Sequence, residues 1–298
     1  MLKPLLKGDR VVIISPAGFV GSSLQPAIDV LKSWGLEVEV GKYARSQKGY
    51  FAGTDGHRLE DLQWALDHPK VKAILFARGG YGTSRIIDQL NFNGFLKFPK
   101  WLIGFSDITA LHLKVNQLGV PTIHGPMALQ FGKKEYASSI EHLQQLLFTG
   151  LSTINVKGDF KESQTIQADI TGGNLSLLID SMATPNELNT RDRILFIEDI
   201  GEGIYKIDRM LMHLKRAGKL EEIKALIIGH FTNISDTSPA YHQTLYELIE
   251  STLARPDVPI VTHFPAGHEP ENIALPLGLP AQLEISPTKA KLKMSMRS

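Results

Sequence analysis

The sequence predicts an α/β protein whose first half is built on a mostly parallel sheet. Apolar runs such as residues 11–14 and 71–76 are continuous, which is typical of parallel strands covered on both faces. Segments with helical spacing separate these runs, and such alternation indicates a parallel sheet with flanking helices. The chain has 298 residues, enough for one large or two medium domains.

The elements of the N-terminal half follow one another in a regular order. We expect strands at 11–14, 36–40, 71–76, 101–105 and 120–123, and helices at 24–34, 58–66, 84–90 and 108–118. In parallel sheets, ligands bind beyond the carboxyl ends of the strands. The loops after Ile14, Phe76, Phe105 and Ile123 should therefore meet at one edge of the sheet.

The pattern changes after residue 132. A helix at 139–148 is followed by a polar stretch with Gly and Lys, which we interpret as a linker ending near Gln164. We therefore expect an N-terminal α/β domain at 1–150 and a smaller C-terminal α+β domain at 165–298. Residues 281–294 alternate like an antiparallel pair of strands. The other elements expected there are strands at 168–173, 194–197, 225–228 and 260–261, and helices at 175–182, 204–216 and 238–253.

Composition excludes several classes of function. A formal net charge of +1, without a basic stripe, argues against nucleic-acid binding. The chain has no cysteine and no His-Glu-x-x-His motif, so we predict neither a metal nor a cofactor. A signal peptide is absent, and no apolar run approaches the ~20 residues of a membrane span. We therefore expect a cytoplasmic protein that does not contact membranes.

Ser106 is a candidate nucleophile. An apolar strand ending in Gly104-Phe105-Ser106 passes directly into a helix, which is the setting of a nucleophile elbow. The amide after such a serine lies at a helix N-terminus, where free N–H groups can hold an oxyanion. Ile108 stands where the second glycine of Gly-x-Ser-x-Gly would be. A serine that merely caps the helix is the alternative interpretation.

A glycine-rich loop at residues 77–82 follows another expected strand and belongs to the same edge. Gly79, Gly80 and Gly82 let the backbone approach a ligand closely and offer amides to an anion. The loop matches neither the P-loop nor the dinucleotide-binding pattern. We interpret it as a loop that binds an oxyanion or a carboxylate, with an ordinary turn as the alternative.

A serine nucleophile also needs a base and an orienting carboxylate. His268 stands out among the histidines near strand ends because it lies in an irregular Pro/Gly loop. Glu198 directly follows an apolar strand, with Asp199 and Glu202 as close competitors. The residue pattern leaves both choices open, and the other candidate bases are His124, His230 and His263.

Taken together, the motifs resemble the LD-carboxypeptidases, serine peptidases that include muramoyltetrapeptide carboxypeptidase and the microcin C immunity peptidase. The resemblance covers almost the whole chain. It rests on an ordered set of motifs: FAGTD (51–55) with Arg58 and Leu59, FARGGYG (76–82), GFSD (104–107), HGPM (124–127), TGGNL (171–175), IEDIGE (197–202), GHE (267–269) and LPLG (275–278).

The resemblance implies a Ser-His-Glu triad in which Ser106 is the nucleophile, His268 the base and Glu198 the carboxylate. The backbone amides of Gly80 and Asp107 would form the oxyanion hole. The resemblance also implies a C-terminal domain with a barrel-like sheet, an active site between the two domains, and a homodimer. The implied reaction is hydrolysis of the amide before a terminal D-amino acid, such as release of D-alanine from murein tetrapeptide during cytoplasmic wall recycling.

The terminal carboxylate of such a peptide substrate needs a cation or backbone amides. Arg78 and Gly79 are candidates because they lie in the loop beside the expected oxyanion hole. A structural ion pair is the alternative role for Arg78.

Two other functions stay open. The immunity branch cleaves a peptidyl-nucleotide amide and needs an aromatic platform for the base. Trp34, Trp64 and Trp101 all fall in helix or strand contexts that do not suit this platform. A non-catalytic α/β ligand-binding module would show the same strands and glycine-rich loops.

Overall fold

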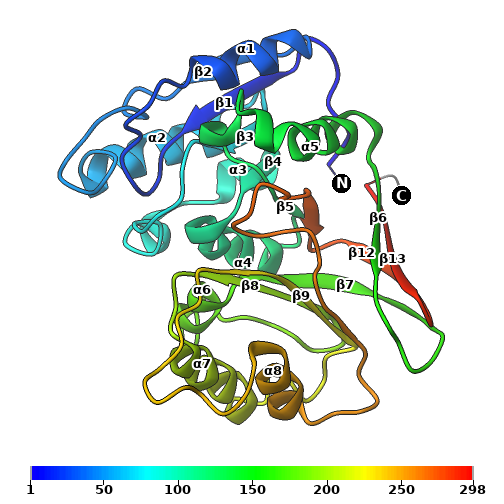
Figure 1. Cartoon of the computed structure of the whole chain (residues 1–298). Helices are drawn as coiled ribbons and strands as arrows, with labels where there is room; N and C mark the ends of the chain where they lie inside the picture. The colour runs from blue at the N-terminus through cyan, green and yellow to red at the C-terminus, as the bar shows by residue number, and fades with distance from the viewer. Residues whose placement is uncertain (1, 297–298) are drawn as a thin grey trace.

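The computed structural model describes residues 2–296 and contains two sheets. The sheet of the N-terminal half and its helices occupy the upper part of Figure 1, and the second sheet with its helices lies below. The predicted fold class, a mostly parallel α/β part followed by a part with a barrel-like sheet, is confirmed.

The first sheet has six strands. Its five N-terminal strands run parallel, and the sixth is antiparallel to its neighbour. One core of apolar side chains surrounds the sheet, which explains the continuous apolar runs. The strands are β1 (Arg10–Ile14), β2 (Glu37–Val40), β3 (Val71–Phe76), β4 (Trp101–Gly104), β5 (Thr122–His124) and β11 (Leu275–Leu277), in the order β11-β5-β4-β3-β1-β2.

Helices connect these strands. They are α1 (Gln25–Ser33), α2 (Asp55–Asp67), α3 (Asn93–Lys97), α4 (Thr109–Gln117) and α5 (Ala137–Thr149), with 3-10 turns η1 (Ile87–Gln89), η2 (Ser106–Ile108), η3 (Ala128–Gln130) and η4 (Lys134–Tyr136). The loops after β1, β3 and β4 meet as predicted. The Gly18 amide donates to the Gly79 carbonyl at 3.1 Å, and Gly79 lies against Ser106.

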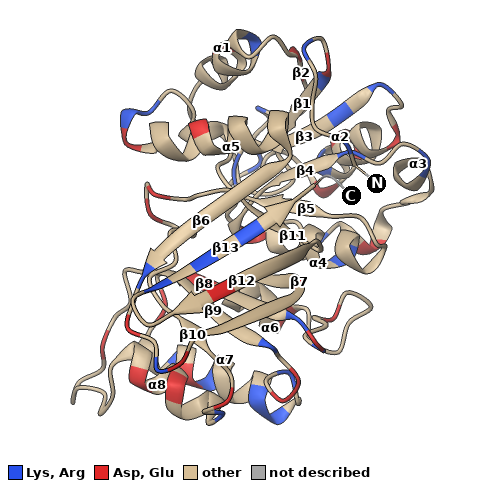
Figure 2. Ribbon diagram, turned by 90° about the vertical axis from the view of Figure 1, so that its right-hand side faces the viewer, with Lys and Arg blue, Asp and Glu red and all other residues tan. Residues whose placement is uncertain are grey.

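The second sheet has seven strands and curls into a half-barrel (Figure 2). Its first part is parallel, and its second part is an antiparallel series. The strands are β6 (Leu151–Lys157), β7 (Gln164–Asn174), β8 (Ile194–Ile200), β9 (Ala225–Thr232), β10 (Ile260–Val261), β12 (Pro280–Ser286) and β13 (Lys289–Ser295), in the order β10-β9-β8-β7-β12-β13-β6.

The two faces of β8 bury different cores. Leu195 and Ile197 pack against the helices α6 (Leu175–Asp180), α7 (Ile204–Arg216) and α8 (Leu245–Leu253). Ile194 and Phe196 belong to the core inside the curled sheet. Glu198 follows Phe196 by two residues, so the strand period directs it to that inner face.

The C-terminal part of the chain donates a strand to the first sheet. β6 directly follows α5 but pairs with β13 in the second sheet. β11 comes late in the chain but pairs with β5 in the first sheet. The first sheet is therefore completed by a strand from the C-terminal part of the chain.

Three expected elements differ in the structure. The expected linker before Gln164 contains the strand β6, in which Ser152, Ile154 and Val156 are buried. The expected helix at 84–90 is only the short η1, because the segment closes tight turns onto the carbonyl of Thr83. The expected helix at 238–253 starts only at Leu245, after a capping box formed by Thr244 and Glu247.

Charged residues lie mainly on the outer faces of the elements (Figure 2). The lysines of β13 alternate with Ala290, Leu292 and Met294, which are buried inside the curled sheet. Within residues 2–296, no helix combines the length and the apolar character that a membrane crossing requires.

Candidate active site

Ser106 lies in a strained turn between β4 and α4. Its φ of +61° falls in the left-handed region, which a non-glycine residue rarely adopts. Ser106 caps no helix, since the caps of η2 and α4 are Phe105 and Ile108. A Cβ on Gly104 would lie 3.0 Å from Ile108 Cγ1, so the tight turn requires glycine there. The structure thus has the geometry of an elbow that presents a serine.

Asp107 ties this turn to the glycine-rich loop. Its side chain is fully buried, and its Oδ2 accepts a hydrogen bond of 2.9 Å from the Thr83 amide. Burial raises the pKa of Asp107 to about 6, although contacts with Thr83 and Gly82 act in the opposite direction. The carboxylate therefore holds the end of the loop against the Ser106 turn.

The glycine-rich loop approaches Ser106 as closely as packing allows. A Cβ on Gly79 would lie 3.0 Å from Ser106 Cβ, 3.2 Å from its Oγ and 3.5 Å from the Asp107 amide nitrogen. Gly80 has a φ of +104°, which favours glycine. Sequence analysis missed Tyr50, whose hydroxyl lies 2.6 Å from the position that a Cβ on Gly80 would take. No pattern in the sequence links these two residues.

Arg78 is half-buried beside the same loop. Its Nη1 donates a 2.6 Å hydrogen bond to the Phe19 carbonyl, and a Cβ on Gly18 would lie 3.5 Å from its Nε. No ion pair of Arg78 is recorded within the described residues, so the alternative role considered for it is not observed. Its guanidinium instead braces the loop after β1.

Glu198 and His268 form a short, buried pair. The Oε2 of Glu198 lies 2.6 Å from the Nδ1 of His268, and the Glu198 side chain is fully buried. Burial lowers the pKa of His268, but the charge and hydrogen bond of Glu198, together with the charges of Asp199 and Glu269, outweigh this and the net pKa is raised. Burial raises the pKa of Glu198, which the contact with His268 opposes. An imidazole in this position is oriented and stabilised in its charged form.

The structure brings His268 to the Ser106 turn. The His268 ring packs against Phe105, the neighbour of Ser106, with a centroid distance of 4.8 Å. Within residues 2–296 no hydrogen bond joins Ser106 to His268. The turn comes from the first sheet, whereas Glu198 and His268 belong to the second part of the chain, so this site lies where the two parts meet.

The competing candidates have other partners. His230 Nε2 lies 2.9 Å from the Glu271 carbonyl, and His263 contacts Tyr246. Asp199 accepts hydrogen bonds from Asn174 and Ser176 and is not directed at a histidine. His124 is fully buried beside Phe105, and neither of its ring nitrogens has a partner in the described part of the chain. Glu202 pairs with Lys206.

Comparison with known proteins decides the family. The model of the LD-carboxypeptidase N-terminal domain matches residues 11–125, and that of the C-terminal domain matches residues 167–283. The chain is 36% identical to the probable murein peptide carboxypeptidase of Bacillus subtilis, over 98% of this chain and 93% of that protein. The chain belongs to the LD-carboxypeptidase family. It is also 31% identical to the murein tetrapeptide carboxypeptidase of Pseudomonas aeruginosa, over 92% of this chain and 93% of that protein.

Solved structures share the LD-carboxypeptidase fold. The muramoyltetrapeptide carboxypeptidase of Oxalobacter formigenes matches with a TM-score of 0.87 and 30% identity, covering 96% of this chain and 98% of that one. The microcin C7 self-immunity protein MccF, bound to aspartyl sulfamoyl adenosine, matches with a TM-score of 0.88. Its identity is 21% over 99% of this chain and 98% of that one, so this likeness concerns the fold alone.

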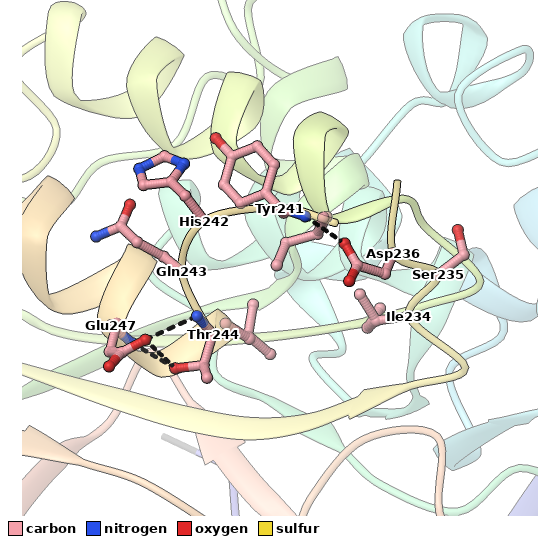
Figure 3. A pocket seen from close by; sticks show the side chains of 10 residues that line it. Ile234, Ser235, Asp236, Tyr241, His242, Gln243, Thr244 and Glu247 are labelled. Carbon is pink, nitrogen blue, oxygen red and sulfur yellow. Dashed lines mark hydrogen bonds between the residues drawn. The ribbon is translucent and has the colours of Figure 1, made fainter. Parts of the chain in front are cut away.

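The structure also has features that lie apart from the candidate site. A pocket of about 460 Å³ lies near the N-termini of α7 and α8, where Asp236 accepts from the Tyr241 amide and Glu247 from Thr244 (Figure 3). No residue predicted for the site lines this pocket. Trp34 and Trp101 are buried in the core of the first sheet.

Proposed function

We propose that the chain is a serine-type LD-carboxypeptidase in which Ser106, His268 and Glu198 form the catalytic triad. The observation that most directly supports this proposal is the 2.6 Å contact between Glu198 and His268, which lies buried beside the turn that presents Ser106. A buried carboxylate orients the imidazole and stabilises imidazolium, which a base that activates serine requires.

In the proposed reaction, Ser106 Oγ attacks the carbonyl carbon before the terminal D-amino acid. His268 takes the proton from Oγ as the new C–O bond forms. The tetrahedral intermediate then collapses, the C–N bond breaks, and His268 protonates the leaving amine. Water, activated by His268, hydrolyses the acyl-enzyme and restores Ser106. Glu198 keeps the imidazole tautomer in place throughout.

The backbone amides of Gly80 and Asp107 form the proposed oxyanion hole. This is supported by the approach of Gly79 to Ser106 and to the Asp107 amide. The loop and the turn belong to the ends of adjacent parallel strands, which brings their amides to the same edge. Donors fixed in this way stabilise the negative charge that develops on the carbonyl oxygen.

We infer that the substrate is a murein tetrapeptide from which D-alanine is released. The names of the relatives, which include murein tetrapeptide carboxypeptidase, support this substrate class. Arg78 and Gly79 are proposed to bind the terminal carboxylate of the substrate. The cytoplasmic location, the role in cell-wall recycling, the homodimer and the domain limits 1–150 and 165–298 remain predictions, as does activity without a cofactor.

The decisive experiment measures release of D-alanine from purified murein tetrapeptide by mass spectrometry. We expect Ser106→Ala, Glu198→Ala and His268→Ala each to lose activity by at least about 10³-fold while circular dichroism stays unchanged. Ser176→Ala, which removes a hydroxyl bonded to Asp199, is the matched control and should keep most activity.

Other outcomes distinguish the alternative functions. Full activity in Ser106→Ala would overturn the serine mechanism. Cleavage of a peptidyl-nucleotide amide in preference to the tetrapeptide would assign the immunity-type activity. Tight binding of the tetrapeptide without turnover in the unaltered protein would favour a non-catalytic module.

A further inference from the structure

A second pocket, of about 590 Å³, lies beside the glycine-rich loop. Lys48, Tyr50 and Phe51 form one part of its lining, and Asp55 and Arg85 form another. Its segment includes the motif FAGTD at 51–55, to which the proposed mechanism gives no role. The pocket therefore combines aromatic rings, cations and one carboxylate from two places in the chain, residues 48–56 and Arg85.

Tyr50 connects this pocket to the proposed catalytic turn. The Tyr50 hydroxyl lies 2.6 Å from the position of a Cβ on Gly80, whose amide is a proposed oxyanion donor. A Cβ on Gly82 would lie 3.3 Å from the Phe51 ring. The pocket lining thus contacts the loop at the residues that follow Gly79, the residue nearest to Ser106.

The pocket has an excess of positive charge. Arg85 donates to both oxygens of Asp55 through Nε at 3.1 Å and Nη2 at 2.7 Å, and Arg58 donates to Oδ1 at 2.5 Å. Arg85 holds the pKa of Asp55 down to about 2, so this carboxyl is ionised at neutral pH. Lys48 forms no ion pair within residues 2–296. Among the residues that line the pocket, two cations, Lys48 and Arg85, therefore accompany the single carboxylate of Asp55.

The guanidinium of Arg85 is placed to receive a further anion. Its Cζ lies 5.4 Å from the centroid of the Phe51 ring, which also lines the pocket, while the buried Arg58 lies 4.6 Å from the same ring. Asp55 uses Nε and Nη2 of Arg85, so the N–H groups of Nη1 are not used by this ion pair. A planar guanidinium with free donors suits a carboxylate.

We propose that this pocket is a subsite for a carboxylate on the acyl side of the peptide substrate. The proposal rests on the function proposed above, because the acyl portion of a murein tetrapeptide carries free carboxylates of D-glutamate and diaminopimelate. His268, which protonates the leaving amine, packs against Phe105, whereas Tyr50 packs against Gly80. The Gly80 side of the loop is therefore left for the acyl portion.

Steady-state kinetics on two peptides test the subsite. One is murein tetrapeptide with free carboxylates, and the other has its acyl-side carboxylates amidated. We expect Arg85→Gln to raise KM for the free peptide on the order of tenfold, and Lys48→Gln to raise it several-fold, with kcat within about twofold. For the amidated peptide, both variants should match the unaltered protein. Lys42→Gln removes a charge from the same chain segment outside the pocket and should change neither KM.

Equal effects of Lys48→Gln and Arg85→Gln on the two peptides, or no effect on either, would overturn the subsite while the unaltered protein still released D-alanine. Lys48→Gln breaks no ion pair recorded within residues 2–296. Its kinetics alone therefore test the subsite if Arg85→Gln does not fold. Calorimetric binding of the product tripeptide gives a second measurement that does not need turnover. Absence of D-alanine release with normal tripeptide binding would reject the proposed function and leave the subsite standing.

Discussion

At the scale of the residue, Asp107 contributes two different groups to the site. Its backbone amide is a proposed oxyanion donor, whereas its carboxylate accepts the Thr83 amide and fastens the glycine-rich loop. The other carboxylate oxygen, Oδ1, is buried without a hydrogen-bond partner in the described chain. Ionisation of this side chain is therefore costly in the folded state, and the pKa is raised.

The raised pKa of Asp107 predicts a dependence of stability on pH. Between its ordinary value of 3.8 and about 6, the unfolded carboxyl ionises before the folded one, so folding loses stability as pH rises. Asp107→Asn removes this ionisation and retains an acceptor for the Thr83 amide. We expect its free energy of unfolding to gain about 3 kcal/mol relative to the unaltered protein between pH 4 and pH 7.

Urea denaturation at both pH values measures this difference. Asp88→Asn, which changes an exposed carboxyl, is the control and should show no comparable trend. A difference between Asp107→Asn and the unaltered protein that stays constant with pH would contradict the account.

Residues of the site differ in how far the sequence could predict them. Ser106 follows from a local pattern, because strand, glycine and helix are contiguous. Glu198 and His268 lie 70 residues apart, and residue pattern alone could not choose them over Asp199 or His230. Only the fold brings that pair together. Tyr50 was missed because its contact with Gly80 is purely tertiary.

At the scale of the element, the proposed site depends on a turn and a loop that approach each other within van der Waals distance. The loop after β3 is fixed at its start by Arg78 and farther along by the contact between Thr83 and Asp107. Between these points, a Cβ on Gly79 would meet Ser106 and the Asp107 amide nitrogen. A side chain on Gly79 must therefore displace either the loop or the serine.

Gly79→Ala tests this dependence. Because the new Cβ would lie 3.0 Å from Ser106 Cβ, we expect kcat for D-alanine release to fall on the order of 10²-fold through displaced oxyanion donors. The melting temperature should change little, since the residue lies in a loop. Gly21→Ala is the control, because its Cβ would make only an ordinary contact of 3.5 Å with Phe19. Unchanged kcat in Gly79→Ala would show that the loop does not act in catalysis.

The elements that sequence analysis misjudged have physical explanations. The alternation of β6 is obscured because Ser152 is buried while Leu151 is exposed, which reverses the usual preference. The start of α8 was locally encoded, since Thr244 and Glu247 form a capping box, but the apolar pattern extended the prediction too far upstream. The parallel strands were predicted well because they are buried on both faces.

At the scale of the whole molecule, β11 makes the first sheet depend on a strand from the C-terminal part of the chain. Without β11, β5 would be an exposed edge of the first sheet, and without β6, β13 would be an edge of the second. Glu198 and His268 also meet the Ser106 turn across this junction. The two parts are thus coupled through main-chain pairing.

This coupling predicts a single unfolding transition. Trp34, Trp64 and Trp101 all belong to the first part, so their fluorescence reports the first sheet, whereas far-ultraviolet circular dichroism reports both sheets. We expect the two signals to coincide during urea unfolding. Leu283→Ala, in the core inside the curled sheet, should shift both curves equally. We expect it to lower the free energy of unfolding by about 2–5 kcal/mol. Separate transitions, or a shift of the dichroism curve alone, would contradict the coupling.

The late position of β11 in the chain also affects folding during synthesis on the ribosome. By the time residue 150 has emerged, the first sheet has every strand except β11, so the Ser106 turn and the glycine-rich loop can fold early. β11 and the proposed base His268 both come from the last 31 residues of the 298. A nascent chain therefore carries this incomplete site for about half of its translation. The proposed hydrolytic activity begins only when the first sheet receives its final strand.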